Sequence, residues 1–206
     1  MFLCCFISLL HASDASEIQF DEYESQAAIC QYKITNEENQ AKCFEDLIKQ
    51  LEPMSLKEFS NLELKTLLAI NYVSLAGVTG SAEALSLIRK AKELLEVVVS
   101  RDPTVVRGTP YVILATLYYR APSWPISFGN NQKAKEFFDK ANQQNHDSLV
   151  TDYFYADYLI KTGHKKEAIQ VLKKALTYEI NPKYELADQG RKQDIENLLQ
   201  KLNKNG

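Results

Sequence analysis

The sequence carries little net charge. Its 206 residues include 24 basic and 27 acidic side chains, which leaves a formal charge of −3. No sequence-wide positive field therefore favours DNA, RNA or anionic lipid as a partner. The composition predicts that nucleic acid is not what this protein binds.

Long apolar runs are also scarce. Residues 1–10 form one, but it is only about half as long as the roughly 20 residues that a membrane-spanning helix needs. Small residues follow it, as at the cleavage site of an export signal, although no Lys or Arg precedes it. We predict a signal peptide over residues 1–15, no integral membrane span, and a periplasmic or secreted protein. A buried N-terminal helix is the alternative.

The chain also lacks the common catalytic and metal-binding motifs. Beyond residue 15 the only histidines are His146 and His164, and their spacing does not suit a shared metal ion. There is no HExxH pair, no phosphate-binding GxxxxGK, no GxSxG elbow and no CxxC. We therefore predict a protein that is not an enzyme and that uses no cofactor and no metal.

Cysteine is sparse as well. Of the four cysteines, removal of residues 1–15 would leave Cys30 and Cys43. An even pair in an oxidising compartment predicts a disulfide, and closing a loop of this size would stabilise the fold by roughly 3 kcal/mol. Two buried free thiols are the alternative.

What the sequence does contain is a repeat of 34 residues. Small and large side chains recur at matching places, which are Gly129, Ala134, Phe138 and Ala141 in one copy and Gly163, Ala168, Leu172 and Ala175 in the next. This period is typical of tetratricopeptide (TPR) repeats, whose helix pairs stack to bury faces that one pair alone would expose. Ala84, Ile88 and Ala91 show the same small-large-small spacing. A small residue lets a neighbouring helix approach closely.

The pattern predicts an all-α fold of antiparallel helical hairpins, stacked as a TPR-like α-α superhelix. One domain covers residues 16–206, and a C-terminal capping helix runs from Tyr184 through Leu202. Residues 22–34 and 37–52 are expected to form the first hairpin, which Pro53 ends, because the residue before a proline is pushed out of the helical region. Residues 16–21 are polar and are expected to be loose.

An insertion interrupts the repeat. The spacing from Ala115 to Ala134 is 19 positions, whereas the matching spacing from Ala156 to Ala168 is 12. The extra residues must lie within 120–129, where two prolines prevent a continuous helix. This segment contains Trp124, the only tryptophan. Trp124 either packs onto the neighbouring hairpin, with Arg120 satisfying carbonyls at its helix end, or meets a partner.

Tyrosines are frequent on the predicted first helix of each hairpin. First helices line the concave face of a solenoid, and a tyrosine ring offers apolar area together with a hydroxyl that fixes orientation. Tyr118 and Tyr155 occupy core-type repeat positions. The predicted partner- or ligand-binding residues are Tyr111, Tyr119, Arg120, Trp124, Tyr153 and Tyr158. For each of the tyrosines a place in the core is the alternative.

Three stretches carry a family resemblance. Residues 152–168, DYFYADYLIKTGHKKEA, resemble one tetratricopeptide repeat. With YRAPSWP at residues 119–125, Gly129, and ADQGR at residues 187–191, the region 56–202 is similar to bacterial exported proteins related to the T component of TRAP-type transporters. The resemblance implies a periplasmic accessory protein that associates with a solute-binding protein and holds an apolar ligand in a central channel.

Two functions follow. The first is a non-catalytic exported scaffold that binds a partner protein on its concave face. The alternative is a TRAP-transporter-associated periplasmic accessory that holds a small apolar or acidic ligand. Repeat architecture favours the first, and the family resemblance favours the second.

Overall fold

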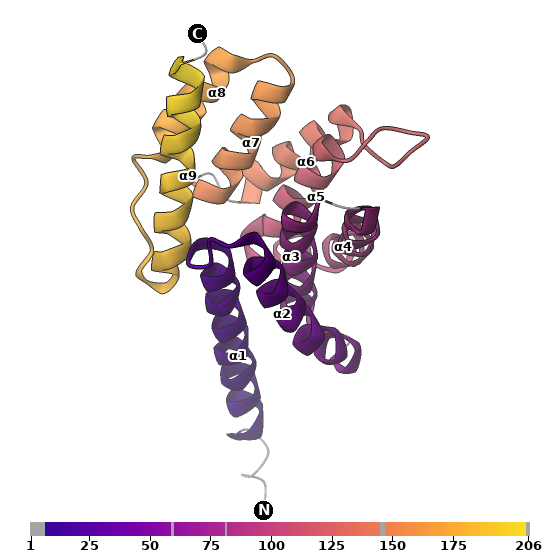
Figure 1. The fold of residues 1–206 in the computed structure, drawn as a ribbon. Coiled ribbons are helices and arrows are strands. Elements are labelled where there is room, and N and C mark those ends of the chain that lie inside the picture. The colour runs from indigo at the N-terminus through magenta and orange to yellow at the C-terminus, as the bar shows by residue number, and fades with distance from the viewer. Residues whose placement is uncertain (1–6, 59, 81, 145–146, 205–206) are drawn as a thin grey trace, which may run out of the picture.

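The computed structural model describes residues 7–58, 60–80, 82–144 and 147–204, with side chains from Phe20 onward, residue 82 excepted. All regular structure in these ranges is helical, which confirms the predicted all-α class (Figure 1). The elements in chain order are α1 (Ile7–Tyr32), α2 (Glu37–Lys57), α3 (Leu62–Thr79), α4 (Ala82–Arg101), the 3-10 turn η1 (Val105–Gly108), α5 (Thr109–Arg120), α6 (Asn131–Gln144), α7 (Leu149–Lys161), α8 (Lys165–Ala175), the 3-10 turn η2 (Pro182–Tyr184) and α9 (Glu185–Lys204).

Helices that follow one another in the chain pair into hairpins. α3 packs against α2 and α4, α5 packs against α6, and α7 packs against α8. α9 lies along α7 and α8, as predicted for the capping helix (Figure 1). α1 contacts α2 and α3 and also α9, so the first and the last described helices meet.

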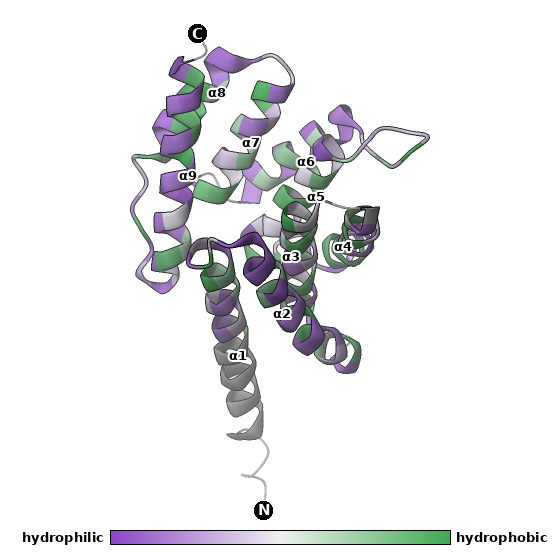
Figure 2. Ribbon diagram, viewed as in Figure 1, coloured by the Kyte–Doolittle hydropathy of each residue, from purple (hydrophilic) through white to green (hydrophobic). Residues whose placement is uncertain are grey.

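The predicted small-residue seams are buried on α6 and α8. Ala134 and Phe138 of α6 and Ala168 and Leu172 of α8 are fully buried. Figure 2 shows why: α6 and α8 have polar outer faces, while apolar residues gather on α3 and α5 at the centre of the molecule. The 34-residue repeat therefore marks helix faces that pack against their neighbours.

The prediction for α4 is only partly right. Ala91 is fully buried, but Ala84 and Ile88 are half-buried, and the buried face runs instead through Leu87 and Leu95. These two residues lie four positions on either side of Ala91, so the buried stripe is centred on Ala91 rather than on Ile88. α4 packs between α3 and α5, and this placement rotates Ile88 towards a central cavity.

Two expected boundaries in the N-terminal hairpin are wrong. Residues 16–21, expected to be loose, belong to α1. α2 continues past Pro53, because the proline removes a single N–H while Leu51 and Ser55 on either side of it are buried. The Lys65 ammonium of α3 donates a hydrogen bond of 2.9 Å to the Ser55 carbonyl and supports this last turn.

The structure bears on the N-terminal predictions only in part. Residues 1–6 of the predicted signal peptide lie outside the described residues, and residues 7–15 begin α1, so cleavage stays a prediction. Cys30 of α1 and Cys43 of α2 form a disulfide, with Cα atoms 5.7 Å apart. None of the described helices is apolar over a stretch long enough to cross a bilayer.

A glycine lets α1 and α9 meet. Gly190 lies inside α9, and a Cβ built there would be 2.4 Å from Cδ1 of Tyr32, at the end of α1. The Tyr32 hydroxyl donates to Asp194 Oδ2 of α9 at 3.4 Å. Gly190, whose place in a predicted helix is otherwise unfavourable, thus admits the ring that joins the two helices.

The insertion forms a projecting loop over residues 121–130, which we call the Trp124 loop (Figure 1). Its base is closed by a 2.9 Å hydrogen bond from the Gly129 N–H to the Pro122 carbonyl. Any side chain at Gly129 would collide with the backbone, because a Cβ there would lie 2.1 Å from the Ala121 carbonyl oxygen. Trp124 is 85% exposed, so the expectation that it packs onto a hairpin is wrong.

Candidate binding cavity

A cavity of about 1550 Å³ lies at the centre of the molecule. Helices α1, α3, α4, α5, α7 and α9 all contribute to its walls, and the contact between α1 and α9 closes it on one side. Its apolar walls include Leu67, Ile70, Val73, Ile88, Ile113 and Leu117. Charged side chains line it as well, among them Arg120, Arg191, Glu24, Asp188 and Asp194, so the wall is mixed, whereas small-molecule sites are usually lined mainly by apolar side chains.

Arg191 of α9 is stacked among aromatic rings at the wall of this cavity. Its guanidinium carbon lies 4.5 Å from the ring centre of Tyr153, 5.0 Å from that of Phe154 and 6.0 Å from that of Tyr32. One terminal nitrogen, Nη1, lies 3.1 Å from Asp194 Oδ2. The buried Nε has no hydrogen-bond partner among the described residues. The guanidinium is held in place, but one of its donors is unused.

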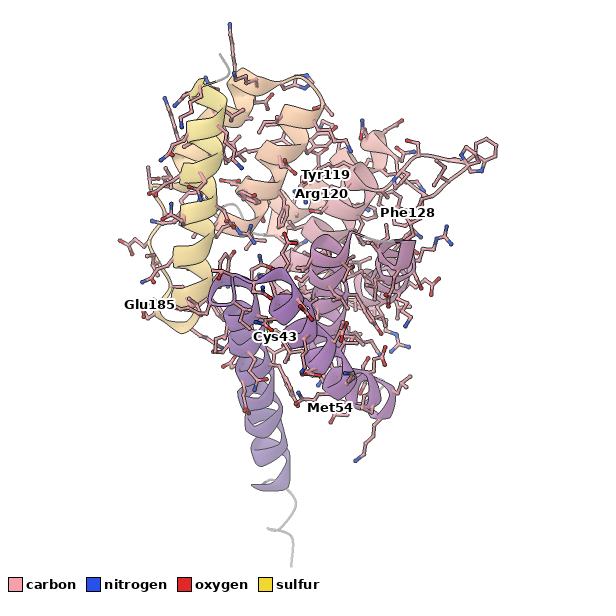
Figure 3. The ribbon with its side chains drawn as sticks, viewed as in Figure 1. Cys43, Met54, Tyr119, Arg120, Phe128 and Glu185 are labelled. Carbon is pink, nitrogen blue, oxygen red and sulfur yellow. A yellow bond between two sulfur atoms is a disulfide. The ribbon has the colours of Figure 1, made fainter. Side chains whose placement is uncertain are left out.

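Arg120, at the end of α5, forms a second cationic group near Phe154 (Figure 3). Its Nη2 lies 2.5 Å from Asp157 Oδ2 on α7, and its Nε donates to the Tyr119 hydroxyl at 3.1 Å. The Tyr119 hydroxyl in turn donates to the same Asp157 oxygen at 2.6 Å.

The charges of this cluster reinforce one another. Burial lowers the pKa of Arg120, but the neighbouring Tyr119 and Asp157 more than offset this and raise it above its usual value. Burial, together with Asp157, raises the pKa of Tyr119 despite the opposing charge of Arg120. Tyr119 therefore stays neutral and Arg120 stays charged, so the cluster supplies a permanent positive group at the cavity wall.

An acidic residue occupies another part of the wall. Burial and the nearby Asp21 raise the pKa of Glu24 on α1 from its ordinary value of 4.5 to about 7, although Lys183 and Arg107 oppose the shift. Asp21 Oδ1 lies 2.9 Å from the Lys183 ammonium. Glu24 Oε2 is buried and has no partner among the described residues. Near neutral pH the Glu24 carboxyl is thus divided between its charged and neutral forms.

The structure separates the residues predicted to bind a partner or ligand. Only Arg120 and Tyr153 line the cavity. Tyr111, Tyr119 and Tyr158 are buried in the helical core, as is Tyr118, which was expected there. Trp124 lies outside the cavity at the exposed loop. A binding role for these six residues remains a prediction.

Arg120 also differs from its expected structural role. In the alternative with a packed Trp124 it would satisfy carbonyls at its own helix end, but its hydrogen-bond partners are the Asp157 carboxylate and the Tyr119 hydroxyl. The carbonyl of Tyr119 accepts instead from the Lys161 ammonium on α7. The side chain of Lys161 thus reaches from α7 to the end of α5 and satisfies a carbonyl there in place of Arg120.

Sequence reasoning missed Arg191 and Glu24. Arg191 lies on the predicted capping helix and Glu24 on the first helix of the predicted N-terminal hairpin, and their proximity to the cavity depends on the meeting of α1 with α9. One signal was present: a glycine in a helix interior, Gly190, immediately before an arginine. A glycine where helix propensity disfavours it often marks the close approach of another element, here the Tyr32 ring.

Comparison with known proteins shows which family the chain resembles. The family model described as TRAP transporter T-component matches residues 68–204, which include α5, α7 and α9 and so the two arginine clusters. No curated protein gives a significant match.

Proposed function

Since the chain belongs to the TRAP transporter T-component family, we propose that it serves such a transporter by holding a small ligand with an acidic group and an apolar body in its central cavity. The observation that carries the proposal is the unused buried donor of Arg191 among three aromatic rings. This is the ligand-holding function that the family resemblance favoured.

The energetics support an acidic group at this position. A buried N–H without an acceptor costs about 1–3 kcal/mol, more where the group is charged, so a shift of the Arg191 side chain that brings Nε to an acceptor on a ligand would recover that free energy. Carboxylates suit a guanidinium, since two oxygens match its planar fork. Arg120 lies on the same ring, Phe154, and is a second guanidinium at the wall, although its charge is balanced by Asp157.

The remaining wall suits an apolar body. Side chains of α3 and α5, such as Leu67, Ile113 and Leu117, face the same cavity. Burial of apolar ligand area contributes about 25 cal/mol per Å², so a ligand with a short hydrocarbon part would gain several kcal/mol here. None of this requires a chemical step, and we predict that the ligand is held unchanged.

A periplasmic location fits the same proposal. The disulfide between Cys30 and Cys43 suits an oxidising compartment, and the apolar residues 1–10 suit an export signal. Within the family, association with other transporter components is expected, and a solute-binding protein is the partner that we propose.

A segment of a protein partner is the second candidate for the cavity. Its volume of about 1550 Å³ exceeds the roughly 300–1,000 Å³ of typical small-molecule sites, which leaves room for an inserted side chain or loop. The partner-binding scaffold predicted from the repeat architecture thus keeps a specific observation in its favour.

Native mass spectrometry of the protein purified from its own cells tests the ligand. We expect a mass above that of the polypeptide, and release of a small acidic molecule on denaturation. Arg191→Gln should lose the added mass. Arg89→Gln removes the same charge from exposed α4, outside the cavity, and should keep it.

Three results would count against a held ligand. The first is the bare polypeptide mass in the unmodified protein, and the second is equal retention in both variants. The third is a bound molecule without an acidic group. Affinity purification from the parent cells addresses the second candidate, because an inserted partner segment would return a protein whose recovery falls with Arg191→Gln.

A further inference from the structure

We propose that the Trp124 loop, residues 121–130, is an interfacial anchor that inserts Trp124 and Ile126 into the headgroup region of a bilayer containing anionic lipid. This surface is distinct from the cavity, since neither residue lines it. The proposal goes beyond ligand holding and does not depend on it.

The loop presents apolar side chains and no charge. Trp124 is 85% exposed and Ile126 is 64% exposed, and both stand on a segment that projects from the helices (Figure 1). Residues 121–132 contain no Asp, Glu, Lys, Arg or His. Insertion would therefore move no ionised side chain of the loop itself out of water, which is the largest cost of entering a membrane, and Arg89, which bonds the Ile126 carbonyl, can stay at the level of the headgroups. Tryptophan is also the residue most typical of the membrane–water interface.

The backbone of the tip makes its own hydrogen bonds. The N–H groups of Ile126 and Ser127 donate to the Ser123 carbonyl at 3.1 and 3.4 Å. The Ile126 carbonyl accepts from Arg89 Nη2 at 3.3 Å, and Pro125 has no N–H to satisfy. Polar backbone groups that are already paired can leave bulk water at little cost. Part of the polar backbone of the tip is thus satisfied before the loop meets an apolar surrounding.

The base of the loop is fixed, and three cations lie around it, of which Lys92 is paired with Glu96 at 2.8 Å. Phe128 packs edge-on against Tyr118, with ring centres 5.5 Å apart, and anchors the loop to α5 (Figure 3). Lys92 lies over the Phe128 ring and Lys133 over the Tyr118 ring, and Arg89 reaches the tip itself. The whole chain has a net charge of −3, so attraction to anionic headgroups is local to this base.

The size of the apolar surface favours a bilayer over a protein pocket. A stable protein interface buries about 800 Å² on each partner, which two side chains on a narrow loop do not supply. Shallow insertion into the headgroup region needs only a few apolar side chains and neighbouring cations, and it gives weak, reversible binding. The loop, with two exposed apolar side chains and cations at its base, matches what shallow insertion into a bilayer requires.

The test uses the intrinsic fluorescence of Trp124, which is the only tryptophan. The whole protein is titrated with vesicles of phosphatidylcholine alone and with vesicles containing phosphatidylglycerol. We expect a blue shift of the emission and protection from an aqueous quencher, both stronger with phosphatidylglycerol and weaker at high salt. Co-sedimentation with the vesicles gives the partition coefficient.

Matched variants identify the surface. Ile126→Ser keeps the fluorophore and should lower the partition coefficient about tenfold. The double variant Arg89→Gln, Lys133→Gln should lower the partition coefficient about fivefold for each charge removed. This loss should occur with vesicles that contain phosphatidylglycerol and not with phosphatidylcholine alone. Leu56→Ser is the control, because Leu56 is 80% exposed on α2, far from the loop in sequence, and its loss should change nothing.

Any of three outcomes overturns the proposal. The first is an emission that stays unchanged at every vesicle concentration. The second is an Ile126→Ser variant that binds vesicles as well as the unmodified protein does. The third is a blue shift that grows with protein concentration when no lipid is present, which would mean that a second copy of the chain covers the loop.

Discussion

Alanine at Gly190 should destabilise the protein, although helix propensity alone predicts the opposite. Gly190 is in the interior of α9, where replacing glycine by alanine normally stabilises a helix by about 1 kcal/mol. The Tyr32 ring occupies the space that the new methyl group needs. The Cβ would lie 2.4, 2.5 and 2.6 Å from three atoms of that ring.

The ring cannot move aside cheaply. The clashing atoms belong to the body of the ring, which is half-buried between α1 and α9, and its hydroxyl is held by Asp194. Overpacking of this kind costs about 1–3 kcal/mol, and the loss of the stacking between Arg191 and Tyr32 adds to it. After subtraction of the propensity gain we expect a net loss of about 1–2 kcal/mol, or a fall in Tm of about 2–8 °C.

Thermal and urea unfolding, followed by helical circular dichroism, measure the effect. Gly77→Ala is the matched control, because Gly77 lies in α3 and a Cβ there would have no atom within 4 Å. This control should gain about 0.5–1 kcal/mol. In a Tyr32→Ala background, Gly190→Ala should become stabilising as well, so the double-mutant cycle should show a coupling of about 1 kcal/mol or more.

The reasoning would be refuted if Gly190→Ala and Gly77→Ala changed the free energy of unfolding in the same direction. It would also fail if the loss at Gly190 persisted without the Tyr32 ring, since the strain would then have another source. In either case the Tyr32 ring would not be what makes alanine unfavourable in place of Gly190.

Three other predictions concern burial, charge and the disulfide. Glu24→Gln should leave stability unchanged at pH 4, where the carboxyl is protonated in both states, and should raise it by about 1–2 kcal/mol at pH 8. The reason is that the folded pKa of about 7 lies above the ordinary 4.5, so the unmodified protein loses stability as pH rises between these values; urea unfolding at several pH values checks this. Ala168→Phe should cost about 1–3 kcal/mol by overpacking the seam of α8, whereas Lys166→Phe on the exposed side should change the unfolding midpoint little, and equal tolerance would contradict the packing. Replacing Cys30 and Cys43 by serine should lower stability by about 2–3 kcal/mol and abolish the effect of a reductant on the urea midpoint.

The helical part of the fold follows from local patterns. Alanines at a spacing of 34 residues located the seams of α6 and α8, and the longer spacing between Ala115 and Ala134 located the projecting loop. Such patterns are readable because a helix face depends on side chains three and four positions apart. The reading was wrong where the chain departs from local rules, as at Pro53, which α2 passes through.

The site was predictable to a smaller extent. Aromatic residues on α5 and α7 were correctly recognised as clustered, but composition could not say which rings face the cavity and which fill the core. Tyr119 is 2% exposed while Tyr153 lines the cavity, although both follow similar patterns along their helices. The orientation of each ring depends on which neighbour its helix meets.

By itself, the sequence determined the class of the fold, the pairing of helices, the place of the insertion and the cysteine pair, because each depends on residues close together in the chain or on simple counts. Only the tertiary structure decided that α9 returns to α1, that Arg191 stacks on rings from α7 and α1, and that Trp124 stands in solvent. The contacts of α9 with α1 join residues more than a hundred positions apart, and the interactions of Arg191 with its rings exist only once the helices have packed.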